Sequence, residues 1–126
     1  MSYQHQITET LSTGGVTYTV QNSITGDGQD DRDESAAGNT TTTVAFAVPK
    51  TKIQSLFVKT DQAITFNTNA SDGSGGNSIT LAAGTALIWF AGCGYANPIT
   101  QDITAIYLVN AGSVSANVTI RCLRDN

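Results

Sequence analysis

The chain has 126 residues, of which only 13% carry a charge, and its formal net charge is −4. That length fits one domain of ordinary size, and the acidic balance with six scattered cations argues against nucleic acid, which calls for a basic face. The N-terminus lacks the basic and apolar regions of a secretory signal, and no apolar run approaches the ~18 residues of a membrane span, so we expect a soluble chain made in a cytoplasm, without a membrane partner.

The residue composition favours sheet over helix. The chain holds 19 Thr, 10 Ile and 8 Val, and these β-branched side chains fit a pleated surface better than a helix. No stretch sustains a helical period. We therefore expect an all-β protein.

Alternation of apolar and polar residues predicts eight or nine short strands, separated by turns rich in Gly, Asn and Asp. In chain order the segments are a weak candidate at 3–10, followed by 15–21, 43–49, 53–59, 63–68, 78–81, 86–91, 103–110 and 114–123. Short strands at this spacing are typical of an antiparallel β-sandwich, and we favour a jelly roll over other sandwich topologies. Residues 1–126 are assigned to this single domain.

Two segments depart from the pattern of alternating strands. Residues 1–12 have a thinner hydrophobic pattern, and we interpret them as an extended arm that orders on docking. Residues 26–41 hold few apolar side chains and are predicted to form a long polar connection.

Half of the ten carboxylates lie in the stretch GDGQDDRDES at 26–35. Because Ca²⁺ prefers several converging oxygens, its aspartates are weak candidates for a calcium site, namely Asp27, Asp30, Asp31 and Asp33. The EF-hand order is absent, and Arg32 in the middle would neutralise part of the charge. A flexible charged loop is the favoured interpretation, and an adventitious or structural cation is the alternative.

The sequence offers no catalytic constellation. One histidine, His5, and two cysteines do not make a zinc site of familiar spacing, and a base recruited from a fraying terminus is poorly placed. Neither a phosphate- or dinucleotide-binding motif nor GxSxG occurs. We predict that the protein is not an enzyme and needs no cofactor. Cys93 and Cys122 are expected to be free thiols, because cytosolic synthesis disfavours a disulfide.

The segments 86–91 and 103–110 are apolar on both faces of the expected strand. A strand in a two-layer sandwich needs only one apolar face, so something must cover the other. The cover is either this chain's own segment at 91–98 or 26–41, or a second subunit, which we favour. We predict that five residues pack between sheets or form the subunit interface: Ile88, Trp89, Phe90, Ile106 and Tyr107.

The part of the chain that follows Lys52 has a recognisable order. It runs SLFVKTDQAITFNTN, a Gly/Ser tip, and SITLAAGTALIWFAGCGYANPITQDITAIYLVNAGSVSANVTIRCL. A Gly-marked turn leads into the tryptophan strand, the connection NPITQDIT follows, and a final strand pair ends in a short charged tail. This order resembles small virion proteins of tailed bacteriophages, namely jelly-roll head-decoration (cement) proteins and small tail components.

The resemblance implies a non-enzymatic protein of the virion, assembled in the host cytoplasm. It would bind a major capsid protein and associate with itself as a dimer or trimer, stabilising the particle through these contacts. The alternative is a carbohydrate- or receptor-recognition module of a phage tail. In that case the acidic loop would bind Ca²⁺, and Trp89 or Tyr95 would stack on a sugar ring, Tyr95 being the better candidate because it lies in a loop.

Overall fold

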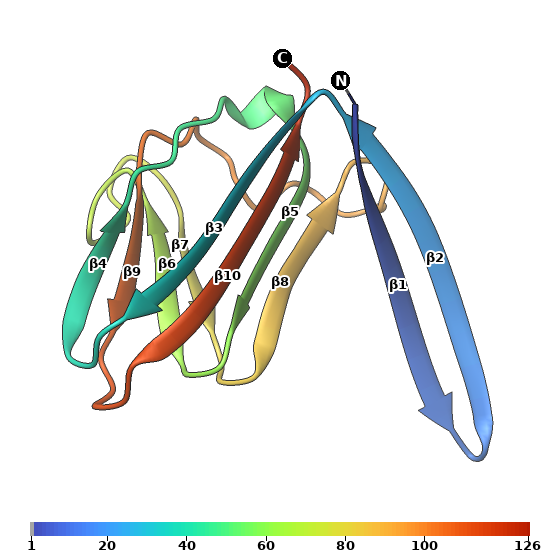
Figure 1. Cartoon of the computed structure of the whole chain (residues 1–126), viewed down its shortest axis with the longest axis horizontal. Coiled ribbons are helices and arrows are strands. Elements are labelled where there is room, and N and C mark those ends of the chain that lie inside the picture. Colours follow the sequence, from blue (N-terminus) through green and yellow to red (C-terminus); the bar gives the residue numbers. More distant parts are fainter. Residues whose placement is uncertain (1) are drawn as a thin grey trace.

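The computed structural model describes residues 2–126 and confirms an all-β sandwich, to which an N-terminal hairpin is attached (Figure 1). The eight strands of the sandwich are β3 (Gly28–Ala36), β4 (Thr40–Val44), β5 (Ile53–Thr60), β6 (Ile64–Thr68), β7 (Ser78–Leu81), β8 (Thr85–Phe90), β9 (Ile106–Asn110) and β10 (Ala116–Arg124). The helical structure within residues 2–126 is a single 3₁₀ turn at Lys50–Lys52. No helix in that range is long and apolar enough to cross a membrane.

The eight strands form two antiparallel four-stranded sheets. Their spatial orders are β3-β10-β5-β8 and β4-β9-β6-β7. The chain passes from one sheet to the other at every connection except β6 to β7, and the last strand, β10, pairs with both β3 and β5. Two such sheets with this order are a jelly roll.

The core lies between the two sheets and follows the alternation of the strands. Leu56 and Val58 of β5 face Ile106 and Leu108 of β9, and all four are completely buried. Phe66 of β6 is the largest fully buried side chain. Because side chains alternate along a strand, the intervening residues form the outer face of each sheet.

The prediction of a long polar connection over 26–41 was wrong for residues 28–36, which form the edge strand β3. This strand pairs along its full length with β10, including Asp31 with Arg121. Its three aspartates, Asp30, Asp31 and Asp33, are tolerated in a sheet because Arg121 and Arg124 of β10 pair with them. The sequence of β3 alone does not reveal those partners.

The first two strands form a long hairpin that stands apart from the sandwich, here called the arm (Figure 1). It consists of β1 (Tyr3–Thr13) and β2 (Val16–Gly26), which are paired over their whole length. Gly14 and Gly15 connect them with φ angles of 56° and 80°. Two consecutive positive φ values are the geometry of the type I′ turn that favours tight hairpins, and glycine adopts them without strain.

The base of the arm is packed on the end of the sandwich. Ile24 of β2 makes a small apolar cluster with Phe90 of β8 and Leu123 of β10, and Ile7 packs against it. At Gly26 a Cβ atom would lie 2.7 Å from the carbonyl oxygen of Arg124. The close approach of these backbones fixes where the arm leaves the body.

Candidate functional site: the arm and the outer face of the first sheet

The arm has one apolar face and one polar face. Cross-strand pairs join Ile7 to Asn22, Glu9 to Val20 and Leu11 to Tyr18, and residues paired in this way point to the same side of a hairpin. The apolar arm face therefore comprises His5, Ile7, Glu9, Leu11 and Thr13 of β1 with Val16, Tyr18, Val20, Asn22 and Ile24 of β2. Glu9 is its single carboxylate.

The opposite face of the arm is uncharged and hydrogen-bonding. It carries only Gln, Thr and Ser side chains: Gln4, Gln6, Thr8, Thr10, Ser12, Thr17, Thr19, Gln21, Ser23 and Thr25. Side chains of these types are commonly exposed, because they form hydrogen bonds with water. The two faces of the arm therefore differ in chemistry, one apolar and one hydrogen-bonding.

Burial of the apolar arm face is limited to the base. Further out, Leu11 is 63% exposed, Tyr18 58%, Val20 59% and Val16 50%. Four large apolar side chains side by side and open to water are unusual for a protein that works as a monomer, whereas scattered single ones are common. This distal patch is the main candidate for a functional surface.

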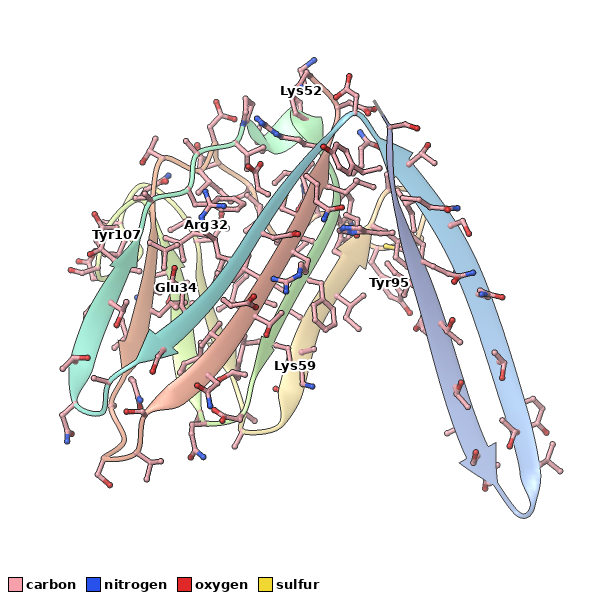
Figure 2. The ribbon with its side chains drawn as sticks, viewed as in Figure 1. Arg32, Glu34, Lys52, Lys59, Tyr95 and Tyr107 are labelled. Atoms are coloured by element: carbon pink, nitrogen blue, oxygen red, sulfur yellow. The ribbon has the colours of Figure 1, made fainter. Side chains whose placement is uncertain are left out.

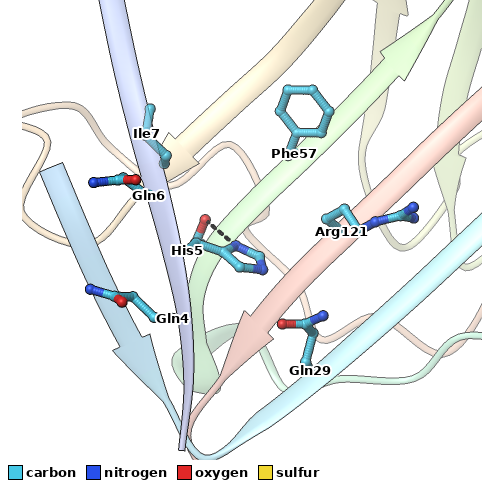
Figure 3. Close-up of a pocket in the computed structure, with 8 residues that line it drawn as sticks. Gln4, His5, Gln6, Ile7, Gln29, Phe57 and Arg121 are labelled. Carbon is cyan, nitrogen blue, oxygen red and sulfur yellow. Dashed lines mark hydrogen bonds between the residues drawn. The ribbon is translucent and has the colours of Figure 1, made fainter. Parts of the chain in front are cut away.

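A pocket of about 330 Å³ lies where the arm meets the body (Figure 3). His5 on β1 and Ser55 on β5 are joined across it by a hydrogen bond of 3.0 Å between Nδ1 and Oγ. Gln29, Phe57 and Arg121 complete the side formed by the sandwich. Burial here lowers the pKa of His5 from 6.5, although the neighbouring Asp31 carboxylate acts in the opposite direction.

The outer face of the β3-β10-β5-β8 sheet continues from this pocket along β5 and β8. Phe57 pairs with Ile88, and the next outward pair is Lys59 with Ala86. Ile88 is 46% exposed, and Lys59 is exposed near the lower end of the body (Figure 2). This outer sheet face therefore has an apolar row followed by a cation.

The four aspartates considered for calcium do not converge. Strand alternation turns Asp30 towards one side of β3, where it pairs with Arg124 Nε at 3.0 Å. Asp31 and Asp33 point to the other side and pair with Arg121 at 3.7 and 3.1 Å. Asp27 accepts a hydrogen bond from the backbone N–H of Asn126. Within residues 2–126 there is no group of three potential ligands placed to hold a metal ion.

The five residues predicted for the interface fall in different environments. Ile106 is fully buried between the sheets, and Phe90 is covered by the arm of its own chain, so neither is free to meet a partner. Trp89 packs against the core and donates a hydrogen bond from Nε1 to the Tyr95 carbonyl oxygen. Ile88 and Tyr107 lie on the outer faces of different sheets.

The apolar second face of β8 is thus covered in part by a segment that the sequence did not suggest. The base of the arm lies on Phe90 together with Cys93 of the 91–98 loop, which was one of the two covers expected within the chain, and Ile88 remains open. Leu11 and Val20, central to the exposed patch, were missed as site residues. The Gly14–Gly15 turn between two alternating segments was the signal that could have identified the hairpin.

Tyr95 and the two cysteines complete the predicted set. Tyr95 is 82% exposed in a Gly-rich loop, with no aromatic neighbour beside its ring among the described residues. Cys93 and Cys122 are both free thiols. Burial raises the pKa of Cys122 to about 12, so this thiol acts as a small apolar core residue.

No protein-family model matches the chain, and no curated protein or solved structure matches it significantly.

Proposed function

We propose that the protein is a non-enzymatic structural protein of a tailed-phage virion, a decoration protein that stabilises the particle by docking its arm and associating with itself. The observation that carries this proposal is the exposed apolar patch of Leu11, Tyr18 and Val20 on a hairpin fixed to a rigid sandwich. Such a patch is the kind of surface that binds protein.

The construction of the arm favours assembly over ligand binding. Its paired strands and the packed junction at Gly26 hold it in one position before any partner arrives. A preordered element loses little conformational entropy on docking, so a modest apolar area suffices for stable binding. The low charge and high Thr content of the body suit a surface that is repeated many times on one particle.

The alternative, a Ca²⁺-dependent recognition module, has weaker support. Its cation would need the aspartates of β3, but Asp30 and Asp31 point to opposite sides of the strand and each pairs with an arginine. Tyr95 remains as an exposed aromatic side chain. A single exposed aromatic ring that lines none of the pockets described is a poor sugar site.

The proposal is tested on particles. The phage that encodes this chain is purified on a density gradient. Mass spectrometry of these particles should then detect the chain in many copies. Particles lacking the gene should release their DNA at a lower temperature. Adding back the purified protein should restore the release temperature.

A matched pair of variants connects the arm with this effect. Tyr18→Ser removes an exposed apolar side chain, and Thr19→Ser changes its neighbour on the polar face. We expect Thr19→Ser to protect the particles fully and Tyr18→Ser to bind at least 10-fold more weakly. Absence of the chain from purified particles would overturn the proposal.

A further inference from the structure

We propose that the distal part of the arm docks on the outer sheet face of a second copy of this chain, and that two copies exchange arms reciprocally. This inference deepens the proposed function, and rests on it for the role of self-association.

The two surfaces have matching chemistry in matching order. Along the arm, the row Leu11 with Tyr18 is followed by the row Glu9 with Val20. Along the sheet, the row Phe57 with Ile88 is followed by the row Lys59 with Ala86. If β1 of the arm runs antiparallel to β5 of the acceptor, the apolar residues of the first rows meet each other. The Glu9 carboxylate then meets the Lys59 ammonium group in the second row.

The two charges are the specific element of this match. Glu9 is the only carboxylate or fixed cation among residues 3–26. Among the described residues, neither Glu9 nor Lys59 has an oppositely charged group within 4.0 Å. A lone charge in an otherwise apolar surface selects the partner that presents the opposite charge at that place.

The chain's own sheet is a poor acceptor for the distal patch. The His5–Ser55 hydrogen bond sets the register at the base of the arm. Beyond that row β5 offers only two further outward residues, Phe57 and Lys59, before the strand ends at Thr60. The arm continues for longer, so closing it on its own sheet would place Glu9 beside Lys59 but leave the row of Leu11 uncovered. A second copy can accept that row.

The area fits a stable dimer. Aromatic side chains expose roughly 150–250 Å² when free and aliphatic ones somewhat less, so the exposed fractions of Leu11, Tyr18 and Val20 correspond to on the order of 300 Å². Covering them removes a similar area from the acceptor. Two reciprocal contacts then bury about 1,200 Å², the lower end of the range for specific interfaces. Reciprocal exchange also gives a closed twofold assembly.

Charge exchange tests the pairing. Wild-type protein should sediment as a dimer at micromolar concentration. Glu9→Lys and Lys59→Glu should each place like charges together at both contacts and weaken the dimer at least 10-fold. The double variant should dimerise like wild type. Lys52→Glu, which makes the same charge change on the exposed 3₁₀ turn, is the matched control and should leave the dimer intact.

Mixing the two single variants distinguishes exchange between chains from closure within a chain. In a heterodimer of Glu9→Lys with Lys59→Glu, both contacts again join opposite charges. The mixture should therefore dimerise although each variant alone does not. Circular dichroism of every variant should match wild type, which shows that a change in association is not due to unfolding.

Three results would overturn the inference. They are a wild-type monomer at all concentrations, a dimer insensitive to both charge reversals, and single variants that fail to associate when mixed. Each leaves the proposed function to be decided by the particle experiment. If the protein still protects particles and Tyr18→Ser abolishes this, the arm docks on the shell and not on a second copy.

Discussion

At the residue scale, the junction between the arm and the body depends on a few polar contacts. His5 is partly buried beside Ser55, and the groups that face it include Asp31 and Arg121. These side chains come from four strands, so the junction forms only when the arm and the sheet have both folded. Its polar bond sits beside the apolar cluster of Ile24 and Phe90.

Acid should loosen this junction. Since burial lowers the pKa of folded His5 below 6.5, the unfolded chain binds the proton more tightly. The contribution of neutral His5 to stability is complete above pH 6.5 and is lost as the pH falls through the lowered pKa. We expect wild type to lose about 2 °C more in Tm than His5→Gln between pH 7.5 and pH 5, since less than ~1 kcal/mol is at stake. Equal losses in calorimetry would contradict this.

At the scale of elements, the arm and the edge strand β3 show where sequence reasoning succeeded and failed. Alternation correctly placed a strand at 63–68, where Ile64 and Phe66 are two residues apart, and the apolar residues of 53–59 correctly marked a second one. It failed at 28–36, because β3 has polar residues on both faces and its arginine partners are about ninety residues away on β10. Such partners cannot be read from a local pattern.

The arm was only partly predictable for a different reason. The segment 15–21 alternates as a strand should, but the same alternation suits a strand inside a sandwich and a strand in a free hairpin. Whether Val20 is buried depends on what lies opposite it, and that is set by the position of the whole arm. The candidate site therefore emerged from the structure, whereas the sandwich class emerged from the sequence.

Packing at the base should hold the arm in its folded form, because an isolated two-stranded hairpin is only marginally stable in water. Ile24→Ala removes a side chain that contacts Phe90 and Leu123, which costs about 2–5 kcal/mol. We expect amide hydrogen exchange in the arm to accelerate at least ~30-fold, with β6 and β9 unchanged. Val20→Ala, on the same face but 59% exposed, is the control. Equal protection in both variants would show that the base packing is unimportant.

At the scale of the whole molecule, the sandwich is complete without the arm but not without its last strand. All strands of both sheets lie within residues 28–124, and β10 lies between β3 and β5. All the large, fully buried side chains belong to this part of the chain. The arm adds a surface, whereas β10 completes the core.

Two truncations test this division. Residues 27–126 should fold cooperatively, with a Tm lowered by ~5 °C because Phe90 and Leu123 lose their cover. Residues 1–115 lack β10 and should not fold, because Ile120 and Val118 are then missing from the core. Circular dichroism and urea unfolding measure both. Failure of 27–126 to fold would show that the arm is part of the cooperative unit.

The unpaired long edges of β1 and β2 have a consequence for how the protein must be handled by the cell. Strands rich in Thr, Val and Gln with free backbone groups on their outer sides can stack edge to edge into fibres. Glu9 is the only permanent charge in that hairpin, and a charge in such a segment acts as a gatekeeper against stacking. Replacing Glu9 by an uncharged residue should therefore favour stacking of the arms, independently of any effect on docking.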